Sequence, residues 1–136
     1  MKYQHQKLAS GGWGKLNFFE QMANIGSEVE RGITWRNKNK GTLVSRKTQN
    51  KETLVSRSAQ NNDKYSQKAI ERAFELLNLT IASQQKQKKL KELTRLREVL
   101  VDYFFGQNQY SSTDRLWQKY FYAFNYAAMK SRAKTH

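Results

Sequence analysis

The sequence predicts an all-α protein folded as an antiparallel four-helix bundle, and three observations favour this fold class. The 136 residues include no proline and only seven glycines, so the residues that most often interrupt helices are scarce. Apolar residues recur three or four positions apart in four separate stretches, as they do on the buried faces of amphipathic helices. No strand-like alternation of apolar and polar residues competes with this pattern, and the length suits a single domain.

The first predicted helix covers residues 16–38 and carries an apolar stripe that begins at Leu16 and ends at Trp35. Gly26 and Gly32 lie inside it, and each glycine costs a helix about 1 kcal/mol relative to alanine. We therefore expect these two positions to mark either a close approach between helices or a bend.

Three further helices follow. The second should run over 64–83 with Asp63 as its N-cap residue, and a polar turn near 84–87 should separate it from the third. The third carries leucines at helical spacing and should end at Gly106, because glycine suits the position after a helix. The fourth should run over 113–132. Short turns at the last two junctions favour antiparallel packing of neighbouring helices.

Two segments are predicted to lie outside the bundle. Residues 1–15 are polar and glycine-rich around Trp13, which indicates a flexible leader before a domain that spans 16–136. Residues 39–62 contain a tandem repeat whose two copies are identical at seven of eleven positions. The polar composition of this repeat predicts a solvent-exposed loop inserted between the first two helices.

The chain is strongly basic, with 25 Lys and Arg residues against 11 Asp and Glu residues and a formal net charge of +14. Such an excess repels itself within a compact fold, and a polyanion is the partner that relieves this repulsion most directly. Nucleic acid, either RNA or DNA, is therefore the predicted partner.

Several classes of chemistry are not expected. Without cysteine the chain forms no disulfide, thiolate zinc site or iron–sulfur cluster, and its two histidines stand near the ends of the sequence. The pairs Glu71/Glu75 and Glu98/Asp102 each place two acids on one helix face, but a di-metal bundle also needs inward histidines. We expect no cofactor, no metal and no enzymatic activity. No apolar run is long enough to span a membrane and the start lacks an apolar signal region, so we expect a cytoplasmic protein.

The candidate nucleic-acid contacts come from two basic clusters, one around the start of the third helix and one in the fourth helix. Each phosphate that they neutralise would release condensed counterions, which gives an affinity that falls with salt and little sequence preference. The candidate residues are Lys86, Lys88, Lys89, Lys91, Arg95, Arg97, Arg115, Lys119 and Arg132.

The fourth helix is unusually rich in aromatic residues, namely Trp117, Tyr120, Phe121, Tyr122, Phe124 and Tyr126. One helix buries only part of its circumference, so some of these rings must face outward. Exposed rings serve either a subunit interface or stacking on unpaired bases. We favour the interface, which predicts a homo-oligomer or a protein partner, because a surplus of apolar surface more often meets another protein.

The segments Tyr65–Leu77 and Leu96–Tyr103 resemble the second and third helices of HEPN-type helical bundles. This resemblance implies an all-helical fold and a role as an RNase or an RNA-associated partner. The family's nuclease signature is an Arg and a polar residue followed by a His, and here Arg97 and Glu98 match its start while Asp102 stands at the histidine position. The resemblance therefore implies a non-catalytic member. In size, basicity and helix number the chain is also similar to proteins encoded by intervening sequences of ribosomal RNA genes and to accessory proteins of diversity-generating retroelements.

Together these observations predict a non-catalytic, basic accessory protein that binds RNA or DNA through phosphate contacts and associates with copies of itself. Two alternatives stay open. One is a protein–protein interaction subunit whose positive surface meets an acidic partner in a larger complex. The other is a degenerate HEPN-like RNase partner.

Overall fold

The structure is a computed structural model that describes residues 12–44, 52–84 and 86–134, with side chains for 12–38, 60–84 and 86–131. Its elements are the short 3-10 helix η2 (Trp13–Lys15) and the helices α1 (Phe18–Val44), α2 (Glu52–Ser83), α3 (Gln87–Phe105) and α4 (Asp114–Lys134). No strand occurs among the described residues. The predicted all-α, four-helix fold class is confirmed.

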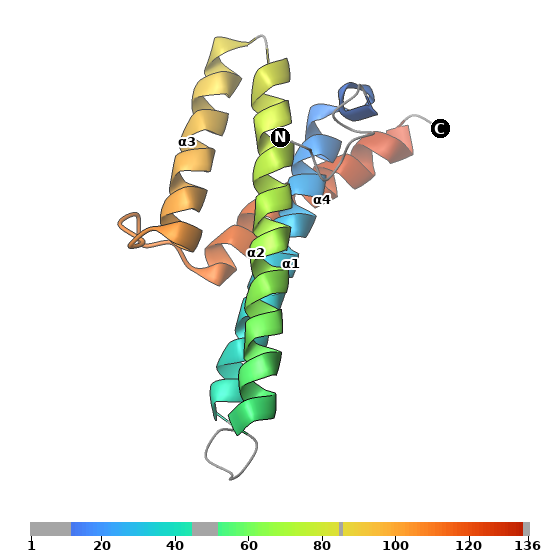
Figure 1. Cartoon of the computed structure of the whole chain (residues 1–136). Helices are drawn as coiled ribbons and strands as arrows, with labels where there is room; N and C mark the ends of the chain where they lie inside the picture. Colours follow the sequence, from blue (N-terminus) through green and yellow to red (C-terminus); the bar gives the residue numbers. More distant parts are fainter. Residues whose placement is uncertain (1–11, 45–51, 85, 135–136) are drawn as a thin grey trace.

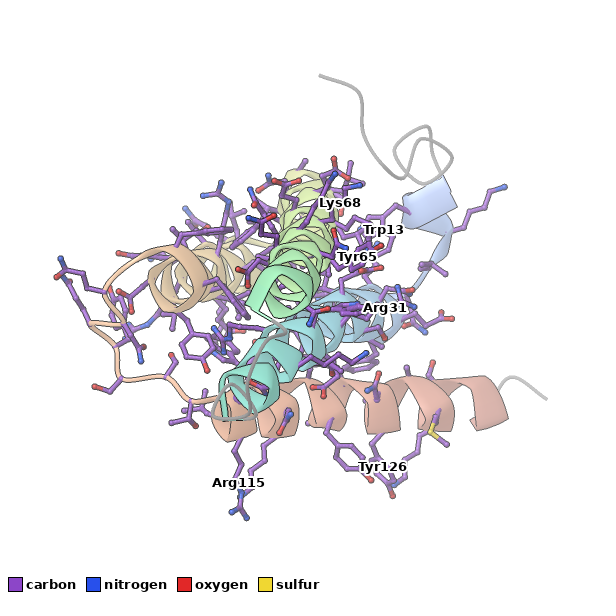
Figure 2. All side chains as sticks on the ribbon, turned by 60° about the horizontal axis from the view of Figure 1, so that its bottom comes forward. Trp13, Arg31, Tyr65, Lys68, Arg115 and Tyr126 are labelled. Atoms are coloured by element: carbon purple, nitrogen blue, oxygen red, sulfur yellow. The ribbon has the colours of Figure 1, made fainter. Side chains whose placement is uncertain are left out.

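A long antiparallel hairpin of α1 and α2 forms the axis of the molecule (Figure 1). α3 turns back beside α2 and runs antiparallel to it, whereas α4 packs against α1. α4 differs from the expected arrangement because it crosses α1 obliquely instead of lying alongside it. Figure 2 makes this clear, since α4 is seen along its length while α2 and α3 are seen nearly end-on.

A single cluster of buried apolar side chains joins the helices. It includes Met22, Ile25, Val29 and Ile33 of α1, Ala73, Leu76 and Leu77 of α2, Leu93, Leu96 and Leu100 of α3, and Trp117 and Phe121 of α4. Members from the same helix follow one another mostly three or four residues apart, so the periodicity in the sequence marks the buried face of each helix. Removal of this apolar surface from water is the main favourable contribution to folding.

Gly26 and Gly32 mark close contacts between helices, one of the two roles expected of them. A Cβ atom on Gly26 would lie 2.6 Å from the Cβ of Phe121 in α4, and one on Gly32 would lie 2.7 Å from Cγ1 of Ile70 in α2. The Ile70 atom belongs to a flexible side chain that can turn away. The Phe121 Cβ is fixed to the backbone, so α4 itself would have to move.

Both helices of the hairpin extend into the segment that was expected to be a loop. α1 continues to Val44 and α2 begins at Glu52, so helical backbone covers most of 39–62. Asp63 therefore lies inside α2 and is not its N-cap, which corrects the sequence prediction. The segment is polar but contains no proline, the strongest helix breaker, so its polarity does not stop a helix. Residues 45–51 lie outside the described residues.

Trp13 corrects the prediction that residues 1–15 stay out of the core. Its side chain is buried, and its indole N–H donates a hydrogen bond of 2.9 Å to Oγ1 of Thr80, which is fully buried in α2. The carbonyl oxygen of Trp13 accepts a second bond of 2.9 Å from Nε2 of Gln21. A large ring whose polar N–H finds a partner is stabilised by burial, and this holds η2 against α2. Residues 1–11 lie outside the described residues.

The connection between α3 and α4 is held by one carboxylate. The Asp102 side chain accepts hydrogen bonds from the backbone N–H groups of Gln109 at 2.8 Å and Tyr110 at 3.0 Å. Gly106 follows α3 as predicted, but its φ of −103° is extended rather than left-handed. The left-handed conformation falls instead on Asn108 and Ser111, with φ values of 56° and 55°, and asparagine tolerates it better than most residues.

The contact at Gly26 gives a stability prediction. Gly26→Ala should destabilise the protein by about 1–3 kcal/mol, because the added methyl group overlaps Phe121 and separates α4 from α1. Chemical denaturation followed by far-UV circular dichroism measures the change. Gly14→Ala is the matched control, since nothing lies within 4 Å of a Cβ built there. Equal stability of the two variants would contradict this account of the crossing.

Candidate functional site

Part of the basic cluster in α3 forms a stripe that points away from the core. Lys88, Lys91 and Arg95 are exposed and follow one another three and four residues apart, so they share one face of the helix. Leu93 and Leu96 lie buried on the opposite side. We call Lys88, Lys91 and Arg95 the α3 stripe. Lys86 is also exposed and precedes the helix.

Two other predicted contacts of the same cluster are held against the body of the protein. The ammonium of Lys89 lies 4.4 Å from the ring centre of Phe18. The guanidinium of Arg97 donates a hydrogen bond of 2.9 Å to Oδ1 of Asn78 and lies 5.9 Å from the ring centre of Phe74. Contacts to α1 and α2 thus orient these two cations, of which Lys89 is half-buried and Arg97 stays exposed.

The C-terminal half of α3 carries acids that take part in the connection to α4. Glu98 accepts a hydrogen bond of 3.1 Å from the hydroxyl of Tyr110, and this bond raises the pKa of that tyrosine above its ordinary value. Asp102 is engaged by backbone N–H groups, as described above. Arg97 and Glu98, which match the start of the HEPN signature, and Asp102, which stands at its histidine position, therefore each have a local partner in this structure.

A groove of about 360 Å³ lies between α3 and α4, and we call it the α3–α4 groove. It is lined by Glu92, Arg95, Leu96 and Val99 of α3 and by Leu116, Trp117 and Tyr120 of α4. Its floor is mainly apolar, and Arg95 of the α3 stripe stands on its wall. Burial in this groove, with a smaller contribution from the charge of Glu92, raises the pKa of Tyr120.

α4 divides its side chains between two faces. Trp117, Phe121 and Ala128 are buried against the other helices, while Phe124 is half-buried and packs on the core. The opposite face is exposed and consists of Arg115, Lys119, Tyr122, Tyr126, Met129 and Lys130. We call these six residues the outer face of α4. Arg115 and Tyr126 both project from α4 away from the other helices in Figure 2.

The predicted interface residues are separated by this division. Trp117 and Phe121 are only 3% and 4% exposed, so they belong to the chain's own core and offer no surface to a partner. Tyr122 and Tyr126 are 68% and 52% exposed, and Tyr120 is exposed at the edge of the α3–α4 groove. The expectation that some rings must face outward is confirmed. The side chain of Arg132, the remaining predicted contact, lies outside the described residues.

A polar cluster fixes the start of α4 against α1 and α3. Arg36 of α1 pairs with Asp114 at 2.5 Å, and the hydroxyl of Tyr103 in α3 also donates to this carboxylate. Asn37 adds a bond of 3.2 Å to the second oxygen of Asp114. Burial, and then the bond to Asp114, raise the pKa of Tyr103 above its ordinary value. Sequence reasoning missed this cluster because its members lie far apart in the chain and only the fold brings them together.

Comparisons with protein-family models, with curated proteins and with solved structures find no match for this chain. None of the described helices combines the length and the apolar character that crossing a lipid bilayer requires. Among the residues that the structure describes, no three acidic or histidine side chains gather closely enough to hold a metal ion. The fold and the described surface define the class of protein: an all-α, four-helix protein with exposed cations on α3 and a basic, aromatic face on α4.

The polar cluster predicts how stability depends on pH. Because the pKa of Tyr103 is higher in the folded protein than the ordinary value of 10.0, its contribution to stability is complete below that pH. The contribution is lost as the pH rises through the raised pKa. Tyr103→Phe should therefore lower stability at neutral pH and should weaken the fall in stability under alkaline conditions.

Urea denaturation over a pH series from about 8 to about 11.5 tests this linkage. Tyr122→Phe is the matched control, because Tyr122 is the most exposed tyrosine of α4. A Tyr103→Phe variant whose alkaline loss of stability equals that of the wild-type protein would show that Tyr103 does not contribute.

Proposed function

We propose that this protein binds nucleic acid through phosphate contacts and acts as a non-catalytic accessory factor. The observation that carries the proposal is a set of exposed cations on two successive helices. Lys88, Lys91 and Arg95 are exposed on α3, and Arg115 and Lys119 are exposed on α4. Exposed cations spaced along helices match the spaced negative charges of a phosphate backbone.

The local balance of charge supports the same proposal. Between Lys86 and Arg97, Glu92 is the only acid, and no acid follows Asp114 through the described part of α4. Asp114 itself is paired with Arg36. The exposed cations are therefore not matched by equal numbers of acids on the same surface, and phosphate binding would release counterions from them.

The non-catalytic part of the proposal is supported by how the residues of the HEPN signature are used. Asp102, at the position of the family's histidine, accepts two backbone N–H bonds that hold the connection to α4. These bonds engage both carboxylate oxygens, and a carboxylate does not offer the ring N–H of the family's histidine. Arg97 is bonded to Asn78. These contacts favour a structural use of both residues.

A second candidate is a protein-interaction subunit, and the exposed rings of α4 favour it. Tyr122 and Tyr126 are large side chains left on the surface, and tyrosine is enriched at protein interfaces. An acidic protein would satisfy the neighbouring cations as well. Binding measurements with nucleic acid separate the two candidates, since a protein-interaction subunit needs no affinity for RNA or DNA at low salt.

The α3 stripe gives the functional test. In a gel-shift or anisotropy titration the wild-type protein should bind RNA or DNA with an affinity that falls steeply with salt. Lys91→Ala/Arg95→Ala should weaken binding about ten-fold at low salt and reduce the slope against the logarithm of salt concentration by about 1.5, because two phosphate contacts are lost.

Lys64→Ala/Lys68→Ala is the matched control, because it removes the same charge from exposed positions on α2. Lys68 lies on the opposite side of the molecule from the labelled residues of α4 in Figure 2. If the control variant weakened binding as much as the α3 variant, the contacts would not be localised to the α3 stripe. Absence of binding by the wild-type protein at low salt would refute the proposed function.

A further inference from the structure

The outer face of α4 combines two kinds of side chain in one continuous stripe. Its residues are Arg115, Lys119, Tyr122, Tyr126, Met129 and Lys130. From Arg115 to Met129 these residues follow one another three or four positions apart, and Lys130 lies four positions after Tyr126, so all six share one side of the helix. Cations therefore stand at both ends of the stripe and two tyrosine rings stand in the middle, one turn apart.

The rings of this face are left open to solvent. Tyr122 is 68% exposed and Tyr126 is 52% exposed, and Met129 beside them is 66% exposed. The ammonium of Lys130 lies 5.0 Å from the ring centre of Tyr126, so a cation already stands against one of the rings. Tyr126 projects away from the other helices (Figure 2). These tyrosines do not contribute to the core, and the fold alone gives no reason for them.

The charged residues on the outer face of α4 are all positive. No acidic residue occurs from Arg115 through the described end of α4. The acids that border α4 have other partners or lie on its other sides. Asp114 pairs with Arg36 beneath the start of the helix, and Glu30 of α1 accepts a hydrogen bond of 3.2 Å from Gln118. Glu92 lies in the α3–α4 groove.

A cleft of about 550 Å³ flanks this face on the side of α1, and Tyr122 forms part of its wall. Gln118 and Asn125 also line the cleft, each with an amide that both donates and accepts hydrogen bonds. Such groups match the mixed donors and acceptors on the edges of nucleobases. Because Glu30 also lines this cleft, the cleft beside Tyr122 suits the polar edge of a base rather than a phosphate.

The positive charge and the exposed rings of the outer face of α4 discriminate between a second copy of the chain, a duplex and a single strand as its ligand. A second copy docked face to face would bring Arg115, Lys119 and Lys130 against the same cations of its partner, and like charges at an interface oppose association. An intact duplex would satisfy the cations but would leave the rings unused, because its bases are already stacked. An unpaired strand offers both phosphates for the cations and free base faces for the rings.

We propose that the outer face of α4 binds single-stranded nucleic acid, with bases stacked on Tyr122 and Tyr126 and phosphates held by the flanking cations. This inference rests on the proposed function and goes beyond it, because it names the strand form that the protein prefers. Stacking on tyrosine tolerates any base, so the preference is for unpaired over paired nucleic acid and not for a particular sequence.

The test compares fluorescence anisotropy of a labelled single strand and of a duplex of the same sequence, each as RNA and as DNA. Tyr122→Ala/Tyr126→Ala should weaken single-strand binding about ten-fold or more and change duplex binding less than two-fold. Tyr122→Phe/Tyr126→Phe keeps both rings and should bind like the wild-type protein. Tyr65→Ala, at an exposed tyrosine on α2 that lies away from α4 in Figure 2, is the control for loss of a surface ring.

Each outcome of this test either supports or overturns the inference. Loss of single-strand binding in the alanine variant, with rescue by phenylalanine, supports the inference. Unchanged single-strand binding in the alanine variant overturns the inference and leaves the phosphate contacts of α3 in place, whereas a wild-type protein that binds neither form overturns the proposed function itself. A variant that binds single strands normally but changes from oligomer to monomer in light scattering would identify the face as a self-interface and would also overturn the inference.

Discussion

The crossing of α4 over α1 at Gly26 is the constraint on which the rest of the structure depends. Because Gly26 has no side chain, Phe121 packs directly against the backbone of α1, and this contact fixes which side of α4 faces inward. Trp117 and Ala128, on the same side as Phe121, are buried in consequence. Tyr122 and Tyr126 must then face solvent, so the surface proposed to bind nucleic acid is a direct result of how the core is packed.

Polar contacts hold the start of α4, and the connection that leads to it from α3, in place. The pairing of Arg36 with Asp114 and the hydroxyl bond from Tyr103 hold the start of α4 against α1 and α3. Asp102 holds the loop between α3 and α4 through backbone N–H groups. With the junction fixed and α4 directed across the hairpin, a groove remains between the two helices that carry the exposed cations. The same side chains that stabilise the fold therefore shape the candidate site.

The sequence predicted the fold class, the buried face of each helix and the importance of Gly26, because periodic apolar residues and rare glycines are signals local to one helix. It missed the burial of Trp13, since a lone ring among glycines carries no periodicity and its partner Thr80 lies in another helix. It also predicted too early an end for α1 and too late a start for α2, because low apolar content is typical of loops. The candidate site was predicted as a set of cations, and only the fold shows that Arg97, although exposed, binds Asn78.

The central claim is that unpaired bases meet the two tyrosines of α4 while phosphates meet the cations around them. Photo-crosslinking with a short oligonucleotide that carries a photoreactive base, followed by mass spectrometry of the digested protein, tests this contact directly. The account predicts covalent adducts on peptides of α4 that contain Tyr122 or Tyr126. Adducts confined to the exposed face of α2 around Lys64 and Lys68, from a strand that is fully bound, would contradict it.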